Sequence, residues 1–574
     1  MPTAGEGERP GAGRSQTSQT RVLFILTVVV GALSGLAAVA FHLSIDVVND
    51  HLLAPVLARS LVGRTVGLFV LLPLTGLIVG VLLWRLVPFA RGSGIPEVKT
   101  AYQFGPGPHL AFRTAAGKFI LGALSIGSGF SLGREGPTVQ ICAAIGAAVA
   151  KFTRRPSRMT RTLISVGAAA GIAAAFNTPI AAITFAMEEV IGDLQQRLVG
   201  AIVVAAVAAA VVERAVMGGR PIFTVPSYSL GAWWELLVYA ALGVVCGLGA
   251  TVFVKGLLGL RRWVKAWTGA PVWAKPALGG VAMAAIGLLW PQVLGIGYPT
   301  MSAALVGSLS TASMAILGGA KLVATVVSYS WGLSGGIFSP ALFVGAMLGG
   351  ATGAIVHQIV PASPDTIGSF ALVGMGAFFA GAVRAPITSI LIIFEMTGDY
   401  AIILPLMISN VLSYTIAARL QPRPIYDALL AQDGVPVADH ETHRDLRAIA
   451  AEQVMTPVAD VIPASTRVRD ATVRVSPDAP AHFVVDDAGR LTGIVTGEDL
   501  ARAAPDAFVR DTARPDVVTI FADESLDAAL LRLGRHRLAR APVVSRLAPD
   551  QLVGLLTLDA ILGAVDRAAS EREG

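Results

Sequence analysis

Apolar stretches recur along most of the chain, from Val22 to about Leu420. A helix needs roughly 20 mostly apolar residues to cross a bilayer, so this pattern predicts many membrane-spanning helices. Gly and Pro interrupt the stretches more often than simple spans require, which predicts broken or tilted helices. Around Pro422 the apolar runs shorten and Asp and Arg become frequent. This change predicts a soluble C-terminal region.

These changes in composition divide the chain into five segments. We expect an N-terminal tail over residues 1–21, a transmembrane domain over 22–430, a linker over 431–452 and two soluble units over 453–507 and 508–568. The tail is polar, rich in Gly and Ser, and basic just before the first apolar run. It is therefore expected to be disordered and cytoplasmic.

Composition agrees with a multi-pass membrane protein. Of the 574 residues 54% are hydrophobic and 14% are charged, and the formal net charge is +6. This modest charge indicates no nucleic-acid partner. Cys142 and Cys246 lie in apolar segments far apart in the sequence, which is typical of small buried side chains and not of a disulfide. The Ala-, Gly- and Arg-rich composition and the lack of organelle signals favour a bacterial cytoplasmic membrane.

The membrane region contains an internal repeat. Residues 166–189 align without gaps with residues 373–396, and this alignment pairs Glu188 with Glu395. A second match pairs Ser131, Gly133, Pro137 and Gly146 with Ser334, Gly336, Pro340 and Gly349. Two halves built alike predict a transport site at their interface. In transporters such repeats are often inverted, and the starts of discontinuous helices converge near the middle of the bilayer.

The halves cover about 22–215 and 230–420, and three of their segments look like helix starts inside the membrane. They are RGSGIPEVK at 91–99, GREGP at 133–137 and GGIFSP at 335–340, with helices expected to open at the prolines. Backbone N–H groups at a helix start carry partial positive charge. Several converging starts would therefore attract a desolvated anion.

The second of these segments places Arg134 beside Glu135. An ionisable residue inside the membrane is a functional candidate by default. When ionised, the Glu135 carboxylate can occupy an anion position; when protonated, it loses that attraction and yields the position. The alternative is that Glu135 only pairs with Arg134 at a helix start.

The soluble region contains two related units, around Val485 and Val543. Each combines an apolar strand, a turn, a second strand with the pattern Gly-x-x-Thr, and a helix start. This duplication resembles a tandem pair of CBS domains, covering about Val454–Ala568.

The CBS resemblance implies a candidate adenine-nucleotide site. Its usual pattern falls on Gly493, Thr496 and Asp499 in the first unit, whereas Ala560 stands where the second unit would need Asp. This departure leaves two readings open: nucleotide binding, or domains that only brace a dimer.

Four motifs in the membrane region resemble signatures of the CLC chloride channel and transporter family. They are GSGIPE at 92–97, GREGP at 133–137, GIFSP at 336–340 and the tyrosine of QPRPIYDALL, Tyr426. The resemblance implies an all-α polytopic membrane domain with two inverted-topology repeats, followed by the soluble α/β CBS pair. It also implies a homodimer with one pore per subunit and cytoplasmic termini.

The resemblance further implies a chloride site made by the hydroxyls of Ser93 and Tyr426 and the backbone N–H groups of Ile337 and Phe338. Lys118 matches a buried family lysine whose charge would help to hold anions. Family members that prefer nitrate or fluoride tend to carry a different residue at the position of Ser93, so the resemblance implies that chloride is the favoured ion. Arg134 would add to the electrostatics of the pathway.

Glu135 matches the family's gating glutamate. Glu189 matches a second, inner glutamate that hands protons toward the gate in proton-coupled members, whereas channels of the family usually carry Val there. A solvated helix end is the alternative reading of Glu188 and Glu189. The resemblance thus implies exchange of chloride for protons, with no required cofactor, no metal and no enzyme activity.

Two other functions stay open. One is a voltage- or pH-gated passive chloride channel of the same fold. The other is an intramembrane enzyme regulated by CBS domains, but the apolar region shows neither a metal-binding His pair nor a nucleophile elbow. The sequence HETH at 440–443 lacks the HExxH spacing and is expected to be a solvated loop.

Overall fold

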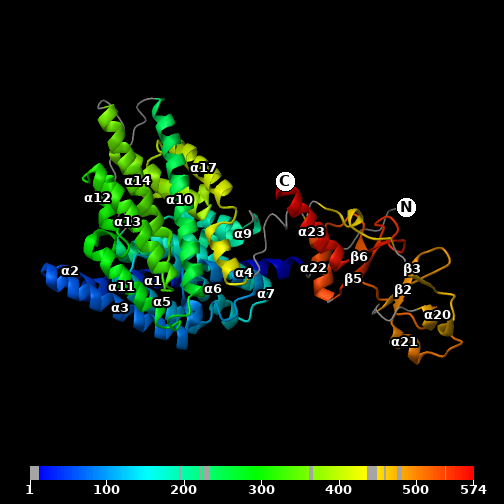
Figure 1. Cartoon of the computed structure of the whole chain (residues 1–574). Coiled ribbons are helices and arrows are strands. Elements are labelled where there is room, and N and C mark those ends of the chain that lie inside the picture. The colour runs from blue at the N-terminus through cyan, green and yellow to red at the C-terminus, as the bar shows by residue number, and fades with distance from the viewer. Residues whose placement is uncertain are drawn as a thin grey trace. The chain divides into compact units, whose positions relative to one another are not determined.

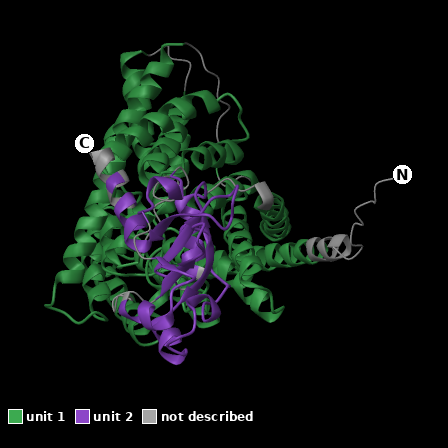
Figure 2. Cartoon of the chain, turned by 90° about the vertical axis from the view of Figure 1, so that its right-hand side faces the viewer, with its two compact units in different colours: residues 1–436 green, residues 437–574 purple. Residues whose placement is uncertain are grey.

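The chain forms two compact units, residues 1–436 and 437–574 (Figure 2). This computed structural model describes residues 12–192, 196–218, 223, 233–360, 366–435, 446, 449–457, 461–474, 481–536 and 538–573. The HETH segment lies outside the described residues. Each unit has hydrophobic clusters of its own.

The first unit is built of helices (Figure 1). Its first half contains α1 (Ala12–Val48), a π-helix (Asn49–Leu53), α2 (Ala54–Leu57), α3 (Leu61–Arg85), a 3₁₀ turn (Pro88–Ala90), α4 (Ile95–Phe104), α5 (Phe112–Gly127), α6 (Glu135–Phe152), α7 (Ser157–Phe176), α8 (Pro179–Phe185), a second π-helix (Ala186–Ile191) and α9 (Gln196–Met217). Its second half contains α10 (Glu235–Ala266), α11 (Lys275–Leu289), a 3₁₀ turn (Pro291–Val293), α12 (Tyr298–Leu305), α13 (Thr311–Ser330), α14 (Phe338–Ile359), α15 (Ile367–Val383), α16 (Pro386–Thr397), α17 (Ile403–Leu420) and α18 (Ile425–Gln432).

The described residues include eight helices long and apolar enough to cross a membrane, and between them lie shorter ones such as α4, α8 and α12. Breaks at Gly and Pro therefore divide the apolar pattern, as the sequence predicted. The expected disordered tail over 1–21 is wrong for residues 12–21, because α1 begins at Ala12 and not at Val22. The remainder of that tail, 1–11, lies outside the described residues.

Glycines let equivalent helices of the two halves pack in the same way. A β-carbon at Gly146 of α6 would lie 2.0 Å from the carbonyl oxygen of Leu163 in α7. A β-carbon added at the repeat-related Gly349 of α14 would likewise lie 2.0 Å from the carbonyl oxygen of Phe370 in α15. Small residues at such crossings let backbones approach closely inside a membrane.

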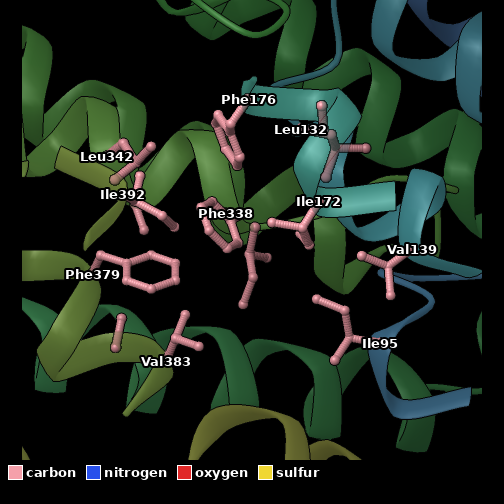
Figure 3. Packing of buried hydrophobic residues seen from close by; sticks show 14 of the residues in the cluster. Ile95, Leu132, Val139, Ile172, Phe176, Phe338, Leu342, Phe379, Val383 and Ile392 are labelled. Carbon is pink, nitrogen blue, oxygen red and sulfur yellow. The ribbon is translucent and has the colours of Figure 1, made fainter. Parts of the chain in front are cut away.

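Buried rings fill the space around the start of α14 (Figure 3). The ring of Phe338 lies 5.0 Å from that of Phe176 and 4.1 Å from that of Phe379, measured between centroids. These contacts join α7, α14 and α15 and fix where the α14 helix starts.

The second unit contains two three-stranded sheets, β1-β2-β3 and β4-β5-β6. In each sheet the first pair of strands is parallel and the second pair antiparallel. The strands are β1 (Val461–Pro463), β2 (His482–Val485), β3 (Leu491–Val495), β4 (Ile520–Phe521), β5 (Arg540–Val544) and β6 (Leu552–Thr557). The accompanying helices are α20 (Val468–Arg474), α21 (Gly497–Arg502), α22 (Leu526–His536) and α23 (Leu558–Glu573), with 3₁₀ turns at Ala451–Gln453 and Val509–Asp511. The strand–turn–strand–helix repeat expected from the sequence is present.

Candidate functional site

Three loops that precede helices are joined by backbone hydrogen bonds. Gly133 and Gly336 exchange two N–H···O bonds of 2.7 Å. Gly92 donates to the carbonyl of Leu333 at 2.9 Å and accepts from the N–H of Gly335 at 3.0 Å. The sequence segments at 91–99, 133–137 and 335–340 therefore meet at one place, across both halves of the first unit.

The helices after these loops begin slightly earlier than the prolines suggested. α6 starts at Glu135 and α14 at Phe338, each two residues before its proline, whereas α4 starts at Ile95, one residue before Pro96. Gly94 can precede α4 because it adopts a left-handed φ of 101°, a conformation that favours glycine. The consequence is that Glu135 itself is the first residue of a helix.

The expected chloride ligands lie at helix starts, with Ser93 before the cap of α4, Ile337 and Phe338 at the start of α14, and Tyr426 in the first turn of α18. Ser93 and Tyr426 are buried, and their hydroxyls lie close together while neither has a hydrogen-bond partner among the described residues. Ile337 and Phe338 are also buried and occupy the cap and first positions of α14, where backbone N–H groups have no acceptor inside the helix. Buried donors of these two kinds, unpartnered hydroxyls and N–H groups at a helix start, suit a small anion.

The Glu135 carboxylate is already in contact with the α14 start. It is fully buried, and its Oε2 accepts from the Ser339 N–H at 3.3 Å. Its Oε1 accepts from the Tyr298 hydroxyl at 3.1 Å and from the Ser339 hydroxyl. The carboxylate thus occupies the position of an anion at a helix N-terminus. The Glu135 carboxylate therefore does not only pair with Arg134 at a helix start, which was the alternative interpretation of the sequence.

Arg134 points elsewhere. Its Nη2 donates to the carbonyl of Ala175 at 3.1 Å, and its guanidinium lies 5.3 Å from the ring centroid of Tyr298. Nε and Nη1 are buried without a partner among the described residues. A buried cation with free donors is therefore present near the Glu135 carboxylate.

Lys118 is fully buried and holds the loop that precedes Ser93. Its Nζ donates to the carbonyls of Ala90 at 3.1 Å, Arg91 at 3.4 Å and Gly92 at 2.6 Å. All its donors are used by carbonyl oxygens, so Lys118 positions this loop and contributes its charge from a distance. Lys321 does the same in the second half, where it donates to the carbonyls of Val293 and Gly295.

The two adjacent glutamates of the second π-helix point to different partners. Glu189 is 4% exposed and accepts from Lys99 Nζ at 2.8 Å. Glu188 accepts from the backbone N–H groups of Ile387 and Thr388. A wider helical turn inserts an extra residue and rotates neighbouring side chains apart. Neither side chain is a solvated helix end.

Tyr298 and Ser339 were not singled out from the sequence. Ser339 lies within the GIFSP motif, and Tyr298 follows Gly297 in GIGYP. That segment is the repeat mate of GSGIP at 92–96, and Gly297 again has a left-handed φ of 92°. Extending the internal repeat alignment across this segment would have found Tyr298.

The candidate nucleotide residues of the second unit bind each other. Asp499 Oδ2 accepts from the Thr496 N–H at 3.1 Å and from its hydroxyl at 2.7 Å, and the Asp499 N–H donates back to Thr496 Oγ1 at 3.1 Å. Arg514 pairs with the other carboxylate oxygen. These bonds hold the pKa of the Asp499 carboxyl below its ordinary value. The bond from the Thr496 hydroxyl lowers the pKa most, and the bond from Arg514 lowers it next. They form a capping box at the start of α21.

No group of three or more His, Cys, Asp and Glu side chains suited to a metal ion occurs among the residues that the structure describes.

Two known domain families match the sequence. The family described as "Voltage gated chloride channel" matches residues 75–418, and the CBS domain matches residues 451–506 and 509–567.

Curated relatives match about seven tenths of the chain. A protein of Vibrio parahaemolyticus serotype O3:K6, named H(+)/Cl(-) exchange transporter ClcA, is 34% identical over 418 residues, which cover 71% of this chain and 89% of that protein. A protein of the same name from Cronobacter sakazakii is 33% identical over 434 residues, covering 74% of this chain and 92% of that protein.

Solved structures have the same fold. One described as a slow cyanobacterial Cl⁻/H⁺ antiporter gives a TM-score of 0.65 at 25% identity, covering 72% of this chain and 97% of the other. One described as a eukaryotic CLC transporter gives 0.66 at 19% identity and covers 94% of this chain and 97% of the other, which shows the fold alone.

Proposed function

Because the chain belongs to the voltage-gated chloride channel (CLC) family and carries a CBS pair, we propose that it exchanges chloride for protons across the membrane. The two resemblances seen in the sequence are confirmed, and the protein is an integral multi-pass membrane protein. Its relatives named H(+)/Cl(-) exchange transporter support this choice of ions. The homologues are transporters, which favours a transporter over an enzyme.

The observation that carries the proposal is the place of the Glu135 carboxylate. It accepts from the Ser339 N–H at a helix start, where a chloride ion would accept the same bond. An ionised Glu135 therefore competes with chloride, and a protonated one does not. In this proposal each proton taken by Glu135 opens the position to an anion, which couples the two ions.

Chloride would bind next to this position. The hydroxyls of Ser93 and Tyr426 and the N–H groups of Ile337 and Phe338 can each donate to it, and they have no partner inside their own elements. Burial excludes water from these donors, which strengthens their attraction for an anion. Lys118 and Arg134 add positive charge to the surroundings of the pathway.

Protons would reach Glu135 by way of Glu189. A carboxylate that exchanges a proton within the membrane is a typical relay group. Glu189 belongs to a different element from Glu135, so it can serve as a separate station for the proton. Glu189→Val should then keep chloride flux and stop proton movement.

Purified protein in liposomes tests this function. A chloride gradient should drive protons uphill, read with a chloride electrode and an internal pH dye in the same preparation. Glu135→Ala should give chloride flux that is uncoupled from protons and insensitive to pH. Chloride flux without any proton movement in the wild-type protein would instead establish the passive channel of the same fold.

The assembly we propose is a homodimer with both termini cytoplasmic, in a bacterial inner membrane. Large apolar side chains are exposed on α8, α16 and α17, for example Ile180, Ile387 and Met407, each about half exposed. Inside a membrane either lipid or a second copy of the chain would cover such surfaces, so the dimer needs a direct test. Cross-linking of a cysteine placed at Ile387 tests the dimer in membranes, and a strictly monomeric protein would contradict it.

For the CBS pair we propose that the first unit takes an adenine nucleotide through Thr496 and Asp499. The ribose would have to replace bonds that Asp499 now makes to Thr496 and Arg514. AMP or ATP should raise the thermal transition of the full-length protein, and Asp499→Ala should abolish the shift. No shift at millimolar nucleotide would favour domains that only brace the dimer.

A further inference from the structure

Lys99 joins two carboxylates that belong to different parts of the proposed transport machinery. Its Nζ donates to Glu189 Oε1 at 2.8 Å and forms an ion pair with Asp427 Oδ1 at 2.5 Å. The side chains of Lys99 and Glu189 are each 5% exposed, and that of Asp427 is 16% exposed. This buried cluster, Lys99, Glu189 and Asp427, is named the Lys99 bridge below.

Each member of the Lys99 bridge sits on an element that also carries, or follows, a proposed functional group. Lys99 is in α4, whose cap is preceded by Ser93. Asp427 is in α18, directly after Tyr426. Glu189 is in the second π-helix, and both this π-helix and α18 pack on α4. The bridge therefore ties the two hydroxyl ligands of the chloride site to the inner glutamate.

The charges of the bridge make it responsive to a proton on Glu189. With both carboxylates ionised, one ammonium serves two anions and the cluster carries one net negative charge. With Glu189 protonated, Lys99 and Asp427 remain as a neutral pair. A buried ion pair interacts strongly because little water screens it, so its geometry depends on the charge of its third member. The charged or titratable groups that face Glu189 are Lys99, Asp427, Glu188 and Tyr426.

We propose that Lys99 is a positioning residue that links the protonation of Glu189 to chloride binding at Ser93 and Tyr426, acting through Asp427. When Glu189 takes a proton, Lys99 is shared with Asp427 alone, and α18 is held to α4 more closely beside the chloride ligands. When Glu189 is ionised, it competes for the same ammonium. The inference rests on the proposed function, in which Glu189 is the inner proton-transfer group.

Three variants separate the links of this bridge. Glu189→Gln should stop proton movement and raise chloride affinity at least threefold above wild type, because Lys99 is then shared with Asp427 alone and holds α18 more closely to α4. Asp427→Asn should weaken chloride binding at least threefold and keep proton coupling, because Lys99 still holds Glu189. Lys99→Met should lower both the proton-to-chloride ratio and the chloride affinity at least threefold. Lys99→Arg, which keeps the positive charge, should leave both quantities near their wild-type values.

Lys275→Met is the matched control. Lys275 is also a buried lysine, but within the described part of the chain its ammonium binds the backbone carbonyls of Val264 and Trp267 and no carboxylate. It should leave the proton-to-chloride ratio and the chloride affinity unchanged. An equal loss in both lysine variants would mean that removing any buried cation disturbs the unit, and would overturn the assignment.

Chloride affinity is measured by calorimetry on the full-length protein in detergent, and the ratio by dual-ion flux in liposomes. Lys99→Gln replaces Lys99→Met if the latter does not give a single symmetric peak in size-exclusion chromatography. A Lys99 variant with the wild-type ratio and affinity overturns the proposal. If the wild-type protein moves no protons, the proposed function fails, while the calorimetry on Lys99→Met and Asp427→Asn still decides whether the bridge controls chloride binding.

Discussion

Glu188 and Glu395 cap each other's helices across the two halves of the membrane unit. The Glu188 carboxylate accepts from the N–H groups of Ile387 at 3.2 Å and Thr388 at 2.8 Å, at the start of α16. The Glu395 carboxylate accepts from the N–H groups of Ile180 and Ala181, at the start of α8. The internal sequence alignment paired these two glutamates, and the structure shows that they are exchanged between repeats.

This exchange predicts equal losses of stability for two single substitutions. Glu188→Gln and Glu395→Gln each keep only one acceptor for two N–H groups, so each should cost about 1–2 kcal/mol. The thermal transition in detergent should fall by about 2 °C or more in both variants. Because the sites are repeat-related, each is the control for the other. A transition unchanged in both would show that the caps do not hold the halves together.

Without the Tyr298 hydroxyl, the Glu135 carboxylate should leave its position at the start of α14 more easily. Tyr298→Phe deletes the 3.1 Å bond to Glu135 Oε1 and keeps the ring below Arg134. A hydrogen bond to a charged group is worth about 1.5–3 kcal/mol, so exchange limited by this release should become about tenfold faster or more. Stopped-flow chloride efflux measures the rate.

Tyr414→Phe serves as its control because Tyr414 is more than a third exposed, on α17. Its efflux rate should equal that of the wild-type protein. A Tyr298→Phe protein that is slower than wild type would mean that the hydroxyl assists exchange and does not hold the gate.

The chloride site predicts a loss of affinity from single hydroxyls. Ser93→Ala and Tyr426→Phe each remove one charge-assisted donor, worth about 1.5–3 kcal/mol, or roughly ten- to hundredfold in dissociation constant. Ser93→Pro should also shift preference toward nitrate. Isothermal titration with chloride and nitrate checks both. Unchanged affinity in both hydroxyl variants would remove these residues from the site.

The capping box of the second unit predicts a pH-dependent contribution to stability. Its bonds lower the pKa of Asp499 in the folded state, so the stabilisation is fully present above the unfolded value of about 3.9 and is lost as the pH falls from there through the lower pKa of the folded state. Asp499→Asn should therefore lower the transition of a fragment spanning 437–574 at pH 7, and its difference from the wild-type transition should narrow as the pH falls below about 3.9.

Circular dichroism of the two fragments follows this transition. Thr496→Ala removes the hydroxyl at the other end of the box and should cost about 1 kcal/mol at either pH. The experiment requires a cooperative transition in the wild-type fragment. A difference between wild type and Asp499→Asn that does not narrow as the pH falls below about 3.9 would show that the ionised carboxylate is not the source of the stabilisation.

The positions of the helix starts could be predicted because their determinants are local. Gly94 supplies a left-handed turn and Pro96 fits the first turn of a helix, so a short segment specifies a start without its tertiary neighbours. The starts of α6 and α14 were misplaced by two residues. There the paired loops at Gly133 and Gly336 hydrogen-bond each other, and this tertiary contact decides where each helix can begin.

The sequence by itself determined the membrane class, the repeat and the CBS pair, and it marked Glu135 as a functional candidate, because apolar length, internal similarity and an intramembrane charge can be read along one chain. Only the tertiary structure decided what these groups touch. Tyr298 hydrogen-bonds Glu135, Lys99 forms ion pairs with Glu189 and Asp427, and Glu188 accepts hydrogen bonds from the start of α16. These partners are far apart in the sequence, and no local propensity encodes a contact between them. Their meeting depends on how the two halves pack, which brings buried charges together so that each one's burial is compensated.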